Sequence, residues 1–259
     1  LMMNNRNWLR VGNLMFLIAT LALNGLSGGV LRPGYNIGSL SDKYFTLFAP
    51  AGLTFSIWGL IYLSLIGFSI FQLRGLFNKG IPQPAYLSQI GPWFMLSCVF
   101  NMTWLLAWLY EYIGLSLLLM LGLLGSLLMI YLRLGIGQAQ ATNTVRFAVH
   151  LPFSIYLSWI SVATIANVSA WLVSMNLRLG GLSAEYWTVT MVGIAGILGA
   201  FVANRRKDWA YAGVLLWALL GIILKHQGLG EMGFQSIQVA AGVSMGMVLL
   251  GRVLAYWSN

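Results

Sequence analysis

The chain has 259 residues, of which 59% are hydrophobic and only 7% are charged, and its formal net charge is +9. A composition this apolar excludes a soluble protein with a wettable surface, so we expect an integral membrane protein. The single cysteine, Cys98, excludes an intrachain disulfide and a metal site built from several cysteines.

Eight apolar segments are long enough to cross a hydrocarbon layer about 30 Å thick, which takes roughly 20 helical residues. They lack the alternation of barrel strands, and backbone groups in lipid must be satisfied within their own segment, so each is expected to be an α-helix. The sequence therefore predicts an all-α, polytopic membrane protein with eight transmembrane helices. The expected spans are residues 11–31, 52–73, 91–110, 113–132, 147–176, 186–203, 209–225 and 234–257.

Basic residues favour one side of this topology. Because cytoplasmic loops carry the excess of lysine and arginine, the bias predicts that both termini are cytoplasmic. It accounts for the high net charge, so nucleic-acid binding is not needed to explain it. The basic residues on the expected cytoplasmic side are Arg6, Arg10, Arg74, Lys79, Arg133, Arg146, Arg205, Arg206, Lys207 and Arg252, and those on the other side are Arg32, Lys43, Arg178 and Lys225.

The organisation along the chain suggests five helices followed by three. A polar stretch at residues 176–185 separates the two groups, and the last three spans hold few aromatic residues in mid-span apart from Trp217. We therefore expect a five-helix bundle at residues 1–177 and a three-helix extension at residues 178–259. The connection at residues 32–49 ends in apolar residues and is expected to fold back as a cap.

Large aromatic and uncharged polar residues recur at helical spacing in four of the first five spans. Such stripes can converge on a cavity with flat walls and hydrogen-bonding groups, which suits a flat lipophilic molecule with a polar edge. The predicted ligand-binding residues are Asn24, Trp58, Tyr62, Asn101, Trp104, Trp108, Tyr156, Trp159 and Asn167.

Each of these features also has a purely structural interpretation. Ordinary helix packing explains an aromatic stripe as well as a ligand does, and buried asparagines can join helices at about 1 kcal/mol each. Tryptophans near the ends of spans are expected to form the aromatic belt of the membrane interface. These belt residues are Trp8, Trp93, Trp187, Trp209 and Trp257.

Several mechanisms lack the residues that they require. No acidic or basic residue lies near the centre of an expected span, which argues against proton-coupled or ion-coupled transport. His150 and His226 are weak candidates for a single axial ligand to a haem or chlorophyll, and no other metal site is predicted. No set of catalytic residues is recognisable, so an enzyme is the less favoured interpretation.

Three short sequence motifs resemble motifs of the translocator protein family, whose members are also called tryptophan-rich sensory proteins or TspO/MBR proteins. The fifth span resembles the last helix of that family in Tyr156, Trp159 and Asn167. The second span resembles its Trp-x-x-x-Tyr helix through Trp58 and Tyr62, and Asn101 and Trp104 resemble its Asn-x-x-Trp helix. The three motifs occur along the chain in the same order as in the family, and the resemblance covers residues 11–177.

The resemblance implies a five-helix bundle that binds porphyrin, haem, a chlorophyll precursor or a sterol-like ligand, without requiring a cofactor and often as a homodimer. It implies a receptor or sensor in tetrapyrrole homeostasis, stress signalling or regulation of photosynthesis, in a bacterial inner or photosynthetic membrane. A light-dependent breakdown of porphyrin is also attributed to the family. The alternative is an accessory pigment-binding or lipid-binding subunit of a larger photosynthetic or respiratory complex.

Overall fold

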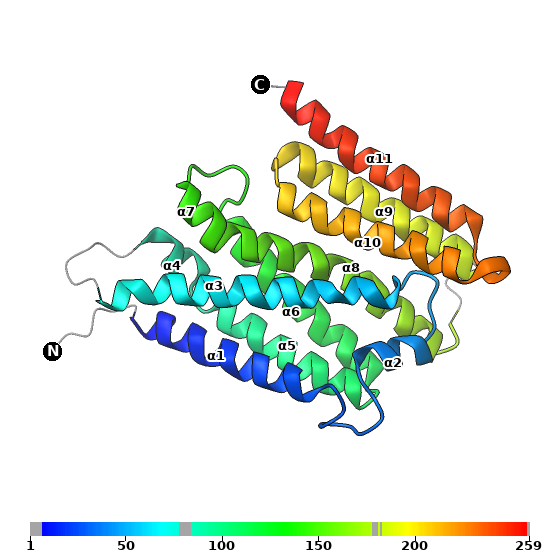
Figure 1. The fold of residues 1–259 in the computed structure, drawn as a ribbon, viewed down its shortest axis with the longest axis horizontal. Helices are drawn as coiled ribbons and strands as arrows, with labels where there is room; N and C mark the ends of the chain where they lie inside the picture. Colours follow the sequence, from blue (N-terminus) through cyan, green and yellow to red (C-terminus); the bar gives the residue numbers. More distant parts are fainter. Residues whose placement is uncertain (1–6, 78–83, 178–180, 182, 258–259) are drawn as a thin grey trace. The chain divides into compact units, whose positions relative to one another are not determined.

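The computed structural model describes residues 7–77, 84–177, 181 and 183–257, and within them all regular structure is helical (Figure 1). The predicted positions Arg6, Lys79 and Arg178 lie outside the described residues. The long helices are α1 (Asn7–Leu26), α3 (Ile57–Phe77), α5 (Trp93–Leu109), α6 (Ile113–Arg133), α8 (Leu151–Ser174), α9 (Ala184–Arg205), α10 (Trp209–Gly228) and α11 (Gln235–Trp257).

This architecture confirms the all-α, polytopic membrane fold. Within the described residues, seven helical segments are long and apolar enough to cross a membrane, and α5 is a shorter apolar helix at the position of the third expected span, residues 91–110. A 3₁₀ turn at Gly52–Ser56 leads into α3, and α7 (Asn143–Val145) and a π-helical turn at Arg146–His150 lead into α8. The short helices α2 (Ile37–Lys43) and α4 (Ala85–Ile90) lie in connections.

Helix ends follow from local sequence. Asp208 caps α10, because its carboxylate accepts hydrogen bonds from the backbone N–H groups of Ala210 at 3.0 Å and Tyr211 at 3.1 Å. Asn176 adopts a left-handed conformation (φ 52°) just after α8, and the N–H of Leu177 bonds back to the carbonyl of Leu172. This pattern terminates α8 and turns the chain toward α9.

The chain divides into two compact units. Unit 1 contains residues 1–36 and 58–157, and unit 2 contains residues 37–57 and 158–259. The connection between α1 and α3 therefore belongs mainly to the unit that holds the C-terminal helices. The domain boundary expected at residue 177 stays a prediction.

In unit 1, aromatic packing and one buried amide pair join the long helices. The rings of Phe68, Phe94 and Phe153 contact one another edge to face, with centroids 5.1 to 5.6 Å apart. The amide of Asn13 on α1 donates to the amide oxygen of Gln72 on α3 at 3.0 Å. These contacts connect α1, α3, α5 and the start of α8 without using a charged group.

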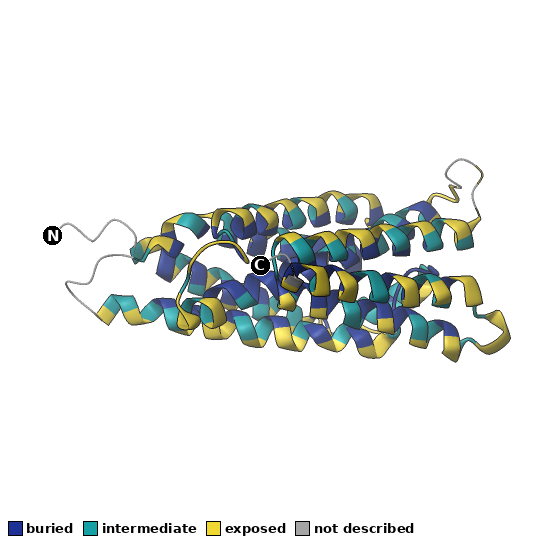
Figure 2. Cartoon of the chain, turned by 90° about the horizontal axis from the view of Figure 1, so that it is seen from above, coloured by how far each residue is buried: buried dark blue, intermediate teal, exposed yellow. Residues whose placement is uncertain are grey.

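In unit 2, α9, α10 and α11 lie side by side, and small residues allow α9 and α11 to approach closely (Figure 1). The buried positions of α11 repeat at steps of four and three, whereas large apolar side chains elsewhere on α9 and α11 are exposed (Figure 2). Exposed apolar faces of this kind suit contact with lipid acyl chains. The buried positions of α11 include Ile237, Ala241, Ser244, Val248, Gly251 and Ala255.

Residues 46–54, which we call the strap, are bound to α10 within unit 2. Lys225 donates to the carbonyl of Thr46 at 2.9 Å, and Trp217 donates to the carbonyl of Thr54 at 3.1 Å. Between them, the N–H of Ala51 donates to the carbonyl of Gly221 at 3.0 Å. Because residues 217, 221 and 225 are four apart, a single stripe of α10 holds the whole strap.

The close approach of α9 and α11 can be tested at Gly251. A Cβ atom there would lie 2.6 Å from the backbone carbonyl oxygen of Ala200, which cannot move aside as a side chain can. We expect Gly251→Ala to lower the free energy of unfolding by about 1–3 kcal/mol, measured by reversible denaturation of the detergent-solubilised protein.

Gly246→Ala is the matched control on the same helix, because a Cβ atom there meets nothing within 4 Å. This substitution should leave stability unchanged or raise it by up to about 1 kcal/mol, since alanine is the better helix former. Equal destabilisation by both substitutions would contradict the close packing.

Candidate functional site

Five of the predicted aromatic residues form one cluster in unit 1. Trp58 stacks on Tyr62, with ring centroids 5.4 Å apart, and on Trp104 at 6.3 Å. Trp104 in turn stacks on Trp108 at 6.4 Å, and Trp58 meets the ring of Tyr156 edge to face at 6.0 Å. The three stacked pairs are tilted by only 19° to 26°, so the cluster presents nearly parallel flat surfaces.

The cluster is a continuous aromatic assembly drawn from three helices. Trp104, Trp108 and Tyr156 are buried, whereas Trp58 and Tyr62 on α3 are only partly buried. The rings contact one another directly. A flat ligand must therefore lie against the partly buried side or separate neighbouring rings.

A chain of amide hydrogen bonds borders the cluster. The amide nitrogen of Asn24 on α1 donates to the amide oxygen of Asn101 on α5 at 2.9 Å. The amide nitrogen of Asn101 donates to the hydroxyl of Tyr156 on α8 at 2.8 Å. Asn24 also donates to the carbonyl of Thr20, one turn earlier on its own helix, at 2.9 Å. The predicted asparagines thus join three helices next to the aromatic rings.

Two buried polar groups of the cluster, the indole N–H of Trp104 and the hydroxyl of Tyr62, form no hydrogen bond with the described residues. The indole N–H of Trp104 is buried, and no acceptor among the described residues forms a hydrogen bond with it. The buried hydroxyl of Tyr62 lies near Asn101, but its geometry does not meet that of a hydrogen bond. An unpaired buried donor costs about 1–3 kcal/mol, so the Trp104 N–H marks a position where a ligand acceptor would be stabilised.

The other two predicted site residues belong to unit 2. Trp159 and Asn167 follow Tyr156 along α8 and are buried. The ring of Trp159 meets Phe55 edge to face at 5.8 Å. The ligand-binding role of Trp159 and Asn167 stays a prediction.

The two histidines differ in their surroundings. In His226 both ring nitrogens are engaged, because Nδ1 accepts from the N–H of Phe234 at 3.3 Å and Nε2 lies 2.9 Å from the carbonyl of Leu47. His226 therefore has no lone pair left for iron or magnesium in this structure. His150 is buried in the π-helical turn before α8, and its role as an axial ligand stays a prediction. Within the described residues, no three His, Cys, Asp or Glu side chains gather as a metal site would require.

Sequence reasoning missed a cavity of about 640 Å³ in unit 2. It is lined by the start of the strap, the end of α8, the start of α9 and Phe234. Trp187, which was assigned to the aromatic belt, lines this cavity and donates its indole N–H to the hydroxyl of Ser169 at 3.1 Å. The spacing of Trp217 and Lys225 on α10 was the available signal for a bound strap, but a sequence does not reveal which carbonyl groups such donors reach.

The fold and the cluster define a polytopic helical membrane protein with a polar-edged aromatic interior. The chain matches the model of the TSPO-like protein family over residues 8–254 and therefore belongs to that family. Membership supports a membrane sensor or receptor kind of function. The matched stretch includes α9, α10 and most of α11. Comparisons with curated proteins and with solved structures gave no match.

The amide chain can be tested at Asn101. Asn101→Leu keeps the approximate volume but removes the acceptor for Asn24 and the donor to Tyr156. Since interhelical hydrogen bonds contribute about 0.6 to 2 kcal/mol each, we expect a loss of about 1–3 kcal/mol in the free energy of unfolding. Titration with denaturing detergent, followed by circular dichroism, measures it.

Thr103→Val, two residues further along α5, is the control, because the Thr103 hydroxyl bonds only to carbonyl groups of its own helix. This variant should unfold like the wild type. A comparable loss in both variants would show that the amide chain does not join the helices.

Proposed function

We propose that this protein is a membrane receptor or sensor that binds a tetrapyrrole, such as a porphyrin, haem or chlorophyll precursor, or a similar flat lipophilic molecule, at the aromatic cluster. The observation that carries the proposal is the buried, unpaired indole N–H of Trp104 within a stack of nearly parallel rings. The TSPO-like family supports the receptor part of the proposal. The ligand class comes from the shape and polarity of the cluster.

The ligand lies against the partly buried rings of Trp58 and Tyr62, which provide a flat surface on α3. Aromatic stacking favours a planar conjugated molecule over an acyl chain, because offset ring pairs gain about 0.5–1.5 kcal/mol beyond the burial of area. A carboxylate or keto oxygen at the edge of the ligand accepts from Trp104. The amide chain fixes α1, α5 and α8 around this edge.

The cluster favours binding over catalysis. Its polar groups are indole, phenol and amide groups, which hold and orient a ligand without an ionised acid or base. The orientation with both termini in the cytoplasm and a homodimeric assembly belong to the same proposal. Neither is needed for the geometry of the cluster.

The proposed binding of a tetrapyrrole can be tested with protoporphyrin IX. Titration of the purified protein should quench tryptophan fluorescence with saturation. Trp104→Phe keeps an aromatic ring but removes the N–H, so its apparent Kd should rise by about 5- to 30-fold, corresponding to about 1–2 kcal/mol for one hydrogen bond to a charged or polar acceptor.

The matched control is Trp8→Phe, because Trp8 is an exposed tryptophan of α1 in the same unit. Its affinity for protoporphyrin should equal that of the wild type. An unchanged Kd in Trp104→Phe, or an equal loss in both variants, would refute the proposed contact.

A further inference from the structure

We infer that the cavity in unit 2 is a second ligand site, which takes a neutral amphiphile with one apolar chain and a small uncharged headgroup. The cavity volume of about 640 Å³ lies within the range of about 300–1,000 Å³ that is typical of small-molecule sites. All its lining residues belong to unit 2, whereas the aromatic cluster belongs to unit 1. The inference therefore does not depend on the proposed function.

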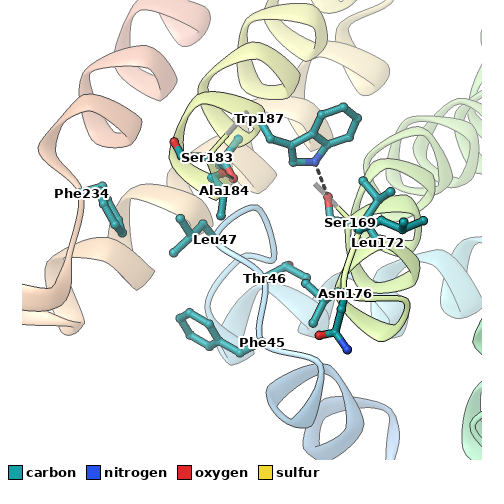
Figure 3. Close-up of a pocket in the computed structure, with 13 residues that line it drawn as sticks. Phe45, Thr46, Leu47, Ser169, Leu172, Asn176, Ser183, Ala184, Trp187 and Phe234 are labelled. Carbon is teal, nitrogen blue, oxygen red and sulfur yellow. Dashed lines mark hydrogen bonds between the residues drawn. The ribbon is translucent and has the colours of Figure 1, made fainter. Parts of the chain in front are cut away.

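Its walls are built from fixed elements. The left-handed turn at Asn176 ends α8 and places Asn176 and Leu177 at the cavity. The first turn of α9, capped by Ser183, supplies another wall, and the indole of Trp187 is directed to Ser169 across the gap between α9 and α8 (Figure 3). This hydrogen bond holds the two helix ends together next to the cavity.

Phe45 and the first two residues of the strap, Thr46 and Leu47, form a further wall, and side chains of α10 contact them. Lys225 donates to the carbonyl of Thr46, and its ammonium group lies 4.6 Å from the centroid of the Phe45 ring. His226 bonds to the carbonyl of Leu47. Phe45, Thr46 and Leu47 all line the cavity, so the contacts with α10 fix the position of three consecutive lining residues.

The lining determines the ligand class. None of the 13 lining residues has an ionisable side chain, and the ammonium group of Lys225, which lies against Phe45, already donates to the carbonyl of Thr46. Among the described lining residues, a carboxylate or phosphate would therefore find no oppositely charged side chain, whereas a neutral headgroup needs none. Ser169, Trp187 and Thr188 already use their donors within the protein. The amide of Asn176, at an exposed position, remains for a hydroxyl or ester group, while leucine, valine and phenylalanine side chains suit an acyl chain.

The test uses the full-length protein in detergent and native mass spectrometry, with 1-monooleoylglycerol as the probe. Sodium oleate is the comparison ligand, because it has the same chain and an anionic headgroup. We expect one monooleoylglycerol per chain, and oleate should bind at least tenfold more weakly. Equal or tighter binding of oleate would overturn the neutral class, and the absence of saturable monooleoylglycerol binding would overturn the site.

Two variants fill the cavity from different walls, namely Ala184→Phe on α9 and Val173→Trp on α8. Either folded variant should weaken monooleoylglycerol binding at least tenfold, with protoporphyrin binding unchanged. The control is Ala85→Phe, since Ala85 is also an exposed alanine at the first position of a helix but lies in unit 1. Unchanged binding in the filled variants, or an equal loss in Ala85→Phe, would overturn the assignment. If neither variant folds, the comparison of monooleoylglycerol and oleate binding to the wild-type protein still tests the proposed site and its preference for a neutral headgroup.

Discussion

Hydrogen bonds between uncharged side chains select which helices of this protein meet, because hydrocarbon offers no other partner to a buried polar group. In unit 1, Asn24, Asn101 and Tyr156 connect α1, α5 and α8, and the pair of Asn13 and Gln72 connects α1 to α3. Apolar packing alone would distinguish these helices poorly, since lipid chains are as apolar as leucine. The aromatic cluster is consequently assembled beside the amide chain, and the N–H of Trp104 is a buried donor that this chain of hydrogen bonds does not satisfy.

The same constraint gives the C-terminal helices a structural role. Isolated carbonyl groups in the connection after α1 need donors, and Trp217, Lys225 and His226 on α10 lie next to them. The strap is thereby fixed within unit 2, to which the preceding helix α2 also belongs. At least one of the C-terminal helices, α10, therefore positions a segment from the N-terminal half of the chain.

Much of the fold could be predicted because the length of an apolar span and its helical periodicity are determined by residues that are close together in the sequence. The expected spans agree with the observed helices to within a few residues, and the stripe of Trp58 and Tyr62 does meet Trp104 and Tyr156. The strap and the cavity could not be predicted, because they depend on backbone carbonyl groups that look alike in every sequence. Trp187 shows the difficulty, since its position near a span end is typical of a belt residue while its N–H bonds to Ser169.

The most direct test of the aromatic site is the nuclear magnetic resonance signal of the Trp104 indole N–H. Protein labelled with ¹⁵N at tryptophan, in detergent micelles, gives one side-chain signal for each indole, and the Trp104→Phe variant identifies the relevant one. If the cluster binds a flat ligand through this donor, protoporphyrin IX will shift the Trp104 signal in a saturable manner and leave that of Trp8 in place. Saturable binding of protoporphyrin with an unmoved Trp104 signal would contradict the account.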